Sequence, residues 1–271
     1  MAVFCSIQSI FKAYKNVVFS VQTDLNFSKS LLAVAIRNFD DPKFKDIYQA
    51  GFSVYNLPKD GCNGRSKMFK EIRQIGMGEL ESFKINFENW IDNISLVKVY
   101  NAMEIFLWQA IWWKDFQTFK NPSYDKKSMD SIVNAIKKIL TAEKIRVDTK
   151  NNKHLIAYLK YCSNDVKTFL NQPAICHKNN TWEEFFEMFS VIRNVVAHQG
   201  GIVSKDIKNE LQSKSRDTFN TYFDFEKSEL DTGSLVLKTK NISNFISRVN
   251  NFSLNLIKFL FSEENLDFYE D

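Results

Sequence analysis

Apolar side chains recur every three or four residues over most of this chain, which is the spacing that gathers them on one face of an α-helix. The pattern predicts helices over residues 1–20, 31–37, 68–120, 128–140, 154–171, 181–199, 204–212 and 242–259. With only 8 Gly and 4 Pro to interrupt them, helices are favoured over a fold of many short strands. The densest turn chemistry lies at 56–66, where we predict a long loop.

One stretch departs from the helical period. Residues 218–239 alternate apolar and polar positions around Asp231-Thr-Gly233, which predicts a small β-hairpin. The predicted fold class is therefore all-α, a helical bundle with a hairpin insert before the C-terminal helix. We divide the chain into an N-terminal helical extension of unknown role over 1–80 and a main helical domain over 81–271.

Composition narrows the class of protein without naming a function. At 271 residues, with 44% hydrophobic and 25% charged residues, the chain is an ordinary globular protein that can bury a sizeable core. A net charge of +4 permits nucleic-acid binding but does not argue for it. The four cysteines lie far apart and lack metal-ligand spacing. No signal peptide or membrane-spanning stretch is evident, so we expect a cytoplasmic protein with no membrane partner. We also expect no metal and no cofactor.

Candidate chemistry is concentrated in the helix predicted after Thr181. Thr181 and Glu184 fit a capping box at its start, and Gly200-Gly201 fits a left-handed stop at its end. At 100° per residue, one narrow stripe of this helix collects polar side chains, with Arg193 on its flank. The stripe, which we predict to be exposed, consists of Glu183, Glu187, Ser190, Asn194 and His198. A solvated face could produce the same pattern, and a lone histidine at a helix end is more often a surface residue favoured by the helix dipole.

The spacing of Arg193, Asn194 and His198 resembles the Arg-x4-6-His signature of the HEPN superfamily, which often has a polar residue directly after the arginine. The following Gln-Gly-Gly-Ile-Val is similar to a run found in many bacterial members. The likeness extends more loosely over 83–262, whereas 1–80 has no recognised counterpart.

The resemblance implies a metal-independent endoribonuclease that acts as a homodimer, with two motif helices forming one cleft. His198 would take the 2′-OH proton, and Arg193 would hold the phosphate as its charge grows. Asn194 would orient the phosphate or the imidazole, and Glu187 and Ser190 would be supporting residues. The substrate would be RNA, because DNA lacks the 2′-OH. The expected role is that of an abortive-infection or antiphage effector, or of a toxin held by an antitoxin or sensor protein.

Two other interpretations stay open. The chain could be a non-catalytic HEPN module that binds a nucleotide or a protein partner, or an unrelated helical scaffold with a chance motif. The presence of both arginine and histidine favours the enzyme.

Other short patterns carry less weight. Asp231-Thr-Gly-Ser234 matches an aspartic-protease loop, but one copy in a helical chain is better explained as a turn. We expect His154 to lie on the surface and Cys176-His177 to hold no zinc. Basic residues, which we interpret as solvated helix faces, occur in two clusters: Arg65, Lys67, Lys70 and Arg73, and Lys137, Lys138, Lys144 and Arg146.

Overall fold

A computed structural model gives the fold of the chain. The residues that it describes are 6–39, 41–43, 49–56, 67–74, 76–122, 126–146, 152–175, 179–199, 201–227, 233–237 and 242–262. They form two compact units, one built from 1–23 with 92–271 and the other from 24–91. The described part is mostly helical, as the sequence predicts. None of its helices is both long and apolar enough to cross a bilayer.

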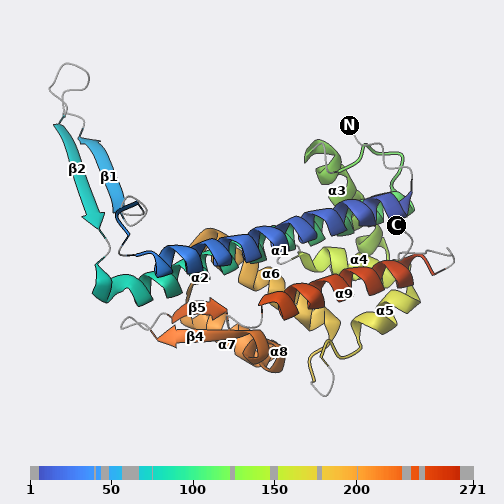
Figure 1. Ribbon diagram of the computed structural model, residues 1–271. Coiled ribbons are helices and arrows are strands. Elements are labelled where there is room, and N and C mark those ends of the chain that lie inside the picture. Colours follow the sequence, from blue (N-terminus) through green and yellow to red (C-terminus); the bar gives the residue numbers. More distant parts are fainter. Residues whose placement is uncertain are drawn as a thin grey trace. The chain divides into compact units, whose positions relative to one another are not determined.

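Helices dominate the larger unit (Figure 1). It contains the first part of α1 (Ile7–Arg37) and the second part of α2 (Leu80–Asp115). The helices that follow are α3 (Lys126–Ala142), α4 (Lys153–Cys162), α5 (Asn164–Leu170), α6 (Trp182–Gln199), α7 (Lys205–Lys214), α8 (Arg216–Tyr222) and α9 (Ile242–Leu260). The short helix α5 packs against α4, α6 and α9. The helix that carries the candidate motif, α6, therefore lies inside a packed bundle.

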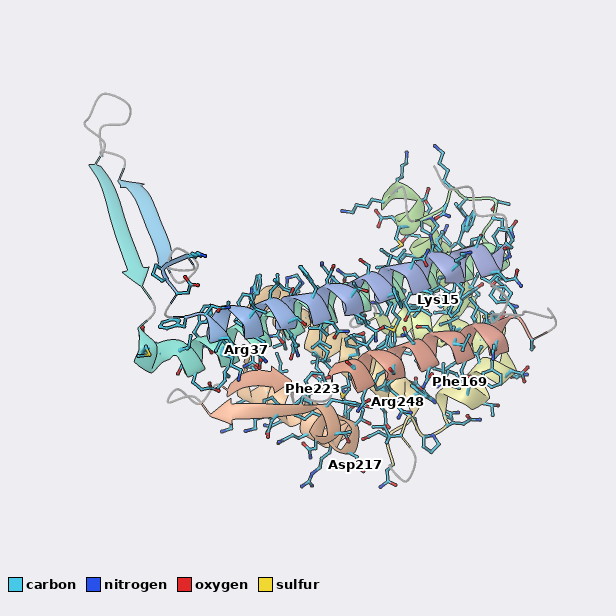
Figure 2. The ribbon with its side chains drawn as sticks, viewed as in Figure 1. Lys15, Arg37, Phe169, Asp217, Phe223 and Arg248 are labelled. Atoms are coloured by element: carbon cyan, nitrogen blue, oxygen red, sulfur yellow. The ribbon has the colours of Figure 1, made fainter. Side chains whose placement is uncertain are left out.

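Aromatic side chains fill the contact between α6 and α9. Phe189 meets Phe245 edge to face with ring centroids 4.9 Å apart, and Phe186 stacks on Phe252 at 5.7 Å. Phe169 of α5, which is labelled in Figure 2, extends this cluster by packing against Phe252 of α9. Each fully buried ring of this kind contributes about 1.5–3 kcal/mol by leaving water. The predicted apolar faces of the motif helix and the last helix are confirmed.

Hydrogen bonds between side chains attach the start of the chain to α9. The Tyr14 hydroxyl donates to Oδ1 of Asn250 at 2.8 Å and accepts from the hydroxyl of Ser253 at 3.1 Å. Burial raises the pKa of Tyr14 well above its ordinary value, since its ionised form would be cut off from water. The first part of α1 is thus an integral part of the bundle.

The predicted hairpin is present, but it begins later and has a third strand. β4 (Phe223–Lys227) pairs antiparallel with β5 (Gly233–Leu237), and the two-residue β3 (Ile202–Val203) joins the other edge of β5. Residues 218–222, predicted as strand, are helical in α8. The reason is a long-range cap: Asn180 accepts hydrogen bonds from the amide and hydroxyl of Thr218 at 3.0 and 3.3 Å. The turn at Asp231 lies outside the described residues.

Three helix boundaries also differ from the prediction. Residues 7–37 form one helix, where two were predicted. The predicted helix over 154–171 is broken at Ser163, whose hydroxyl accepts from the amide of Val166 at 3.2 Å and so begins α5. The helix predicted over 128–140 begins two residues earlier, at Lys126, so Ser128 lies buried inside α3.

The smaller unit contains a hairpin, whose second strand lies where a helix was predicted. β1 (Gln49–Asn56) pairs antiparallel with β2 (Lys67–Gln74), in a register that places Gln49 opposite Gln74 and Asn56 opposite Lys67. The sequence of β2 has good helix formers, and its strand form depends on pairing with β1 rather than on its own residues. The unit also includes residues 24–37 of α1, the 3₁₀ turn η3 (Met77–Glu79) and residues 80–91 of α2. The loop predicted at 56–66 lies outside the described residues beyond Asn56. The extension over 1–80 stays a prediction.

Candidate functional site

The helix that carries the motif begins and ends as the sequence predicts. The amide of Thr181 donates to the Glu184 carboxylate at 2.8 Å, and the amide of Glu184 donates to the Thr181 hydroxyl at 3.3 Å. This pair is the predicted capping box. At the other end Gly201 has φ of 85°, and its amide donates back to the carbonyl of Val195 at 3.2 Å. Gly200 lies outside the described residues.

The polar stripe of α6 was predicted to be exposed along its whole length, but the structure buries its middle. Ser190 is only 1% exposed, and its hydroxyl lies 2.6 Å from the hydroxyl of Tyr100 on α2. Helical periodicity gives the direction of a side chain but not what covers it, and here α2 covers the middle of the stripe. Ser190 is therefore a buried contact within the core, away from solvent.

Tyr100 is the centre of a small polar network between α2, α4 and α6. The amide group of Asn152, just before α4, donates to the Tyr100 hydroxyl at 2.8 Å and to Oε1 of Glu104 at 2.6 Å. Asn152 has φ of 59°, a left-handed conformation that asparagine tolerates better than most residues. Burial, with the nearby charge of Glu104 as a smaller cause, raises the pKa of Tyr100 to about 12.

Arg193 is held by neutral groups on three sides. Its Nε and Nη2 each donate to Oδ1 of Asn101 at 3.4 Å, and Nη1 donates to Oδ1 of Asn194 at 2.9 Å. The guanidinium carbon lies 5.7 Å from the ring centroid of Tyr100, within cation–π range. No described carboxylate forms an ion pair with Arg193, so its positive charge is fixed in place and not neutralised by an acid.

His198 lies in the last turn of α6 and is exposed. Within the described part of the chain its ring has no hydrogen-bond partner. In a regular helix, five residues separate Arg193 from His198 by about 7.5 Å along the axis and about 140° around it. The two side chains of one chain therefore point in different directions. Around the helix axis, Asn194 lies between Arg193 and His198.

The first turns of α6 carry the two glutamates of the stripe into ion pairs with α4. Glu183 pairs with Lys160 at 2.7 Å, and Glu187 pairs with Lys153 at 3.6 Å. Glu187, predicted as a supporting catalytic residue, is thus joined to a lysine. The structure does not place it in one cluster with His198, which follows eleven residues later on the helix.

Other predicted features have mixed outcomes. His154, expected at the surface, is 5% exposed and packs with its ring centroid 5.7 Å from that of Trp108. Its polar neighbours in sequence concealed this burial, because α4 turns His154 toward the core. Cys176 and His177 lie outside the described residues. Three members of one basic cluster, expected on a helix, lie on strand β2: Lys67, Lys70 and Arg73.

A cleft that was not predicted from the sequence lies beside the start of α6. It has a volume of about 730 Å³ and is lined by residues that follow α3 and by residues of α4, α5 and α6. Three of its lysines recur at seven-residue intervals, at positions 153, 160 and 167. For the lysines at 153 and 160, which share α4, that spacing was a usable signal because it keeps side chains on one side of successive helical turns. The lysine at 167 lies on α5, beyond the break at Ser163. Tyr100, Asn101 and Asn152 gave no comparable signal.

Among the described residues, no group of three or more His, Cys, Asp or Glu side chains is placed to hold a metal ion. Comparison with known proteins found no match to the chain among family models, curated proteins or solved structures.

Proposed function

We propose that this protein is a metal-independent endoribonuclease of the HEPN type, with Arg193, Asn194 and His198 at its active site. In the reaction, His198 of one subunit accepts the proton of a ribose 2′-OH, and the new bond from that oxygen to phosphorus displaces the 5′-oxygen. His198 of the second subunit protonates the leaving oxygen. The products are a 2′,3′-cyclic phosphate and a 5′-hydroxyl end.

The observation that carries this proposal is the setting of Arg193. A guanidinium held by the neutral amides of Asn101 and Asn194 keeps its full charge for an anionic ligand. Its position is fixed before any substrate arrives, and preorganised donors of this kind stabilise a phosphorane-like transition state without reorganising during the reaction. An arginine with a purely structural role would more commonly be paired with a carboxylate when it is half-buried.

The exposed position of His198 supports a homodimer as the active form. An exposed imidazole keeps access to solvent and to a substrate, but it forms only half of an acid–base pair. Two-fold symmetry supplies the second copy, because an interface between identical surfaces brings the same residues together. The divergence of Arg193 and His198 on one helix fits an active site shared by two chains.

The cellular role that we propose rests on the resemblance to the HEPN superfamily and not on the geometry of the site. We propose an antiphage, abortive-infection or toxin–antitoxin effector, whose cleavage of RNA is held back by an antitoxin or sensor protein. The alternative is a non-catalytic HEPN module that binds a nucleotide or a protein partner. The basic cleft beside Glu183 and Glu187 is the observation that favours this alternative.

The test is cleavage of a fluorescent single-stranded RNA in EDTA. His198→Ala and Arg193→Ala are each expected to lower the rate by about 10²–10⁴-fold. The matched controls are Gln199→Ala and Arg216→Ala, since both residues are exposed and lie outside the proposed site. Equal rates for wild type and both site variants would contradict the assignment, and circular dichroism would show that each variant is folded.

A further inference from the structure

The cleft of about 730 Å³ has the size of a small-molecule binding site. Its lining residues all belong to the larger unit. They come from four successive segments: the residues after α3, then α4, α5 and the first turns of α6. A concave site built from several rigid helices holds its side chains in fixed relative positions, which favours a specific ligand over loose surface contacts.

Positive charge exceeds negative charge in this cleft. Four basic side chains face two carboxylates, Glu183 and Glu187, which leaves a formal charge of +2. The basic residues are Arg146, Lys153, Lys160 and Lys167.

The two carboxylates of the cleft neutralise two of its four basic side chains. Lys160 and Lys153 are paired with Glu183 and Glu187. Arg146 and Lys167 form no ion pair with any residue that the structure describes. The uncompensated charge therefore belongs to one arginine and one lysine, a combination that binds phosphate oxygens both by hydrogen bonds and by charge.

An apolar surface lies beside these charges. Ile145, Ile156 and Ala157 line the cleft together with the ring of Tyr161, which is 45% exposed. The Tyr161 hydroxyl donates to Oε1 of Glu143 at 3.3 Å, which restrains the ring. A restrained, partly exposed aromatic ring offers a flat surface on which a planar base can stack.

We propose that this cleft binds a nucleoside polyphosphate, with its phosphates on Arg146 and Lys167 and its base against Tyr161. The cleft is separate from Arg193 and His198, and the proposal stands whether or not the protein cleaves RNA. Inorganic phosphate alone would leave the apolar side of the cleft unused.

The experiment is isothermal titration of the full-length protein with ATP, pyrophosphate, adenosine and a single-stranded oligodeoxynucleotide. We expect ATP to bind more tightly than pyrophosphate, and adenosine to bind weakest. Arg146→Gln and Lys167→Gln should each weaken ATP binding by about tenfold, the loss expected for one hydrogen bond to a charged group. The control is the double variant Lys205→Gln/Arg216→Gln, which removes one lysine and one arginine, both exposed, outside the cleft. It should bind ATP as wild type does.

Tyr161 tests the base contact separately. Tyr161→Ala should weaken ATP binding by about tenfold and leave pyrophosphate binding unchanged, whereas Tyr161→Phe should retain ATP binding. Three results would each overturn the proposal: no ATP binding by folded wild type, equal ATP affinity in the cleft variants and the control, or binding of the oligonucleotide but not of ATP. None of these readings uses RNA cleavage, so they leave the ribonuclease proposal to its own test.

Discussion

The hydrogen bond between Tyr100 and Ser190 joins α2 to the motif helix, and removing it should cost a definite amount of stability. Tyr100→Phe deletes the hydroxyl that lies 2.6 Å from Ser190 Oγ and 2.8 Å from Asn152 Nδ2. Ser190 is 1% exposed and cannot turn to water. The Ser190 hydroxyl would lose its partner, and a buried polar group without a partner costs about 1–3 kcal/mol. Asn152 would add less to this cost, because it keeps its hydrogen bond to Glu104. We expect the free energy of unfolding to fall by about 2 kcal/mol.

A double-mutant cycle isolates this contact from other effects of the tyrosine. Ser190→Ala alone should cost about 1 kcal/mol, because the Tyr100 hydroxyl keeps its bond from Asn152. In the double variant Tyr100→Phe/Ser190→Ala no serine hydroxyl is left unpaired. Its loss should stay near that of Tyr100→Phe, which gives a coupling energy of about 1 kcal/mol.

The assay is urea denaturation followed by circular dichroism, with the slope m compared among variants to show that the unfolded states match. Tyr161→Phe is the control, since its hydroxyl contact with Glu143 is exposed and its loss should leave the free energy of unfolding almost unchanged. Strictly additive losses in the cycle would contradict the predicted coupling, and so would a Tyr100→Phe variant as stable as the control. Either result would mean that the Tyr100–Ser190 hydrogen bond does not join α2 to α6.

Three further predictions follow from single features. Asn101→Ala should lower the RNA cleavage rate about tenfold by releasing the guanidinium of Arg193, and an unchanged rate in the folded variant would contradict its positioning role. Gly201→Ala should lower the free energy of unfolding by about 1–2 kcal/mol because its φ is 85°, whereas Gly78→Ala, with open space around the added Cβ, should change it little. The pKa of Tyr100 is raised to about 12, so the folded state favours the neutral phenol. Its stabilisation should be complete below the unfolded pKa of about 10 and decline as the pH rises toward 12. An ultraviolet titration in which every tyrosine of the folded protein ionised near pH 10 would refute this.

Features encoded by neighbouring residues could be predicted from the sequence. The start of α6 depends on Thr181 and Glu184, three residues apart, and its end on a glycine that alone adopts the required φ easily. The apolar period of α9 was strong enough to specify its buried face. In each case the physical cause lies within one or two helical turns of its effect.

Features that depend on distant residues could not be predicted in this way. Helix α8 begins where Asn180 caps Thr218 across 38 residues of chain. The burial of Ser190 depends on Tyr100, 90 residues away, and the strand form of β2 depends on β1. For the candidate site, spacing identified Arg193 and His198 but gave no indication of Asn101, which orients the guanidinium. Side-chain surroundings, unlike helical period, are set by tertiary packing.

The measurement that tests the central proposal most directly is the chemistry of the ends that wild-type protein leaves on a nucleic acid. Two substrates of one sequence would be compared in EDTA, an all-RNA strand and the same strand with 2′-deoxyribose at every position. We expect cleavage of the RNA alone, with 2′,3′-cyclic phosphate and 5′-hydroxyl ends, because the 2′-oxygen is the nucleophile. Cleavage of both strands, or 3′-hydroxyl ends on the RNA, would contradict it.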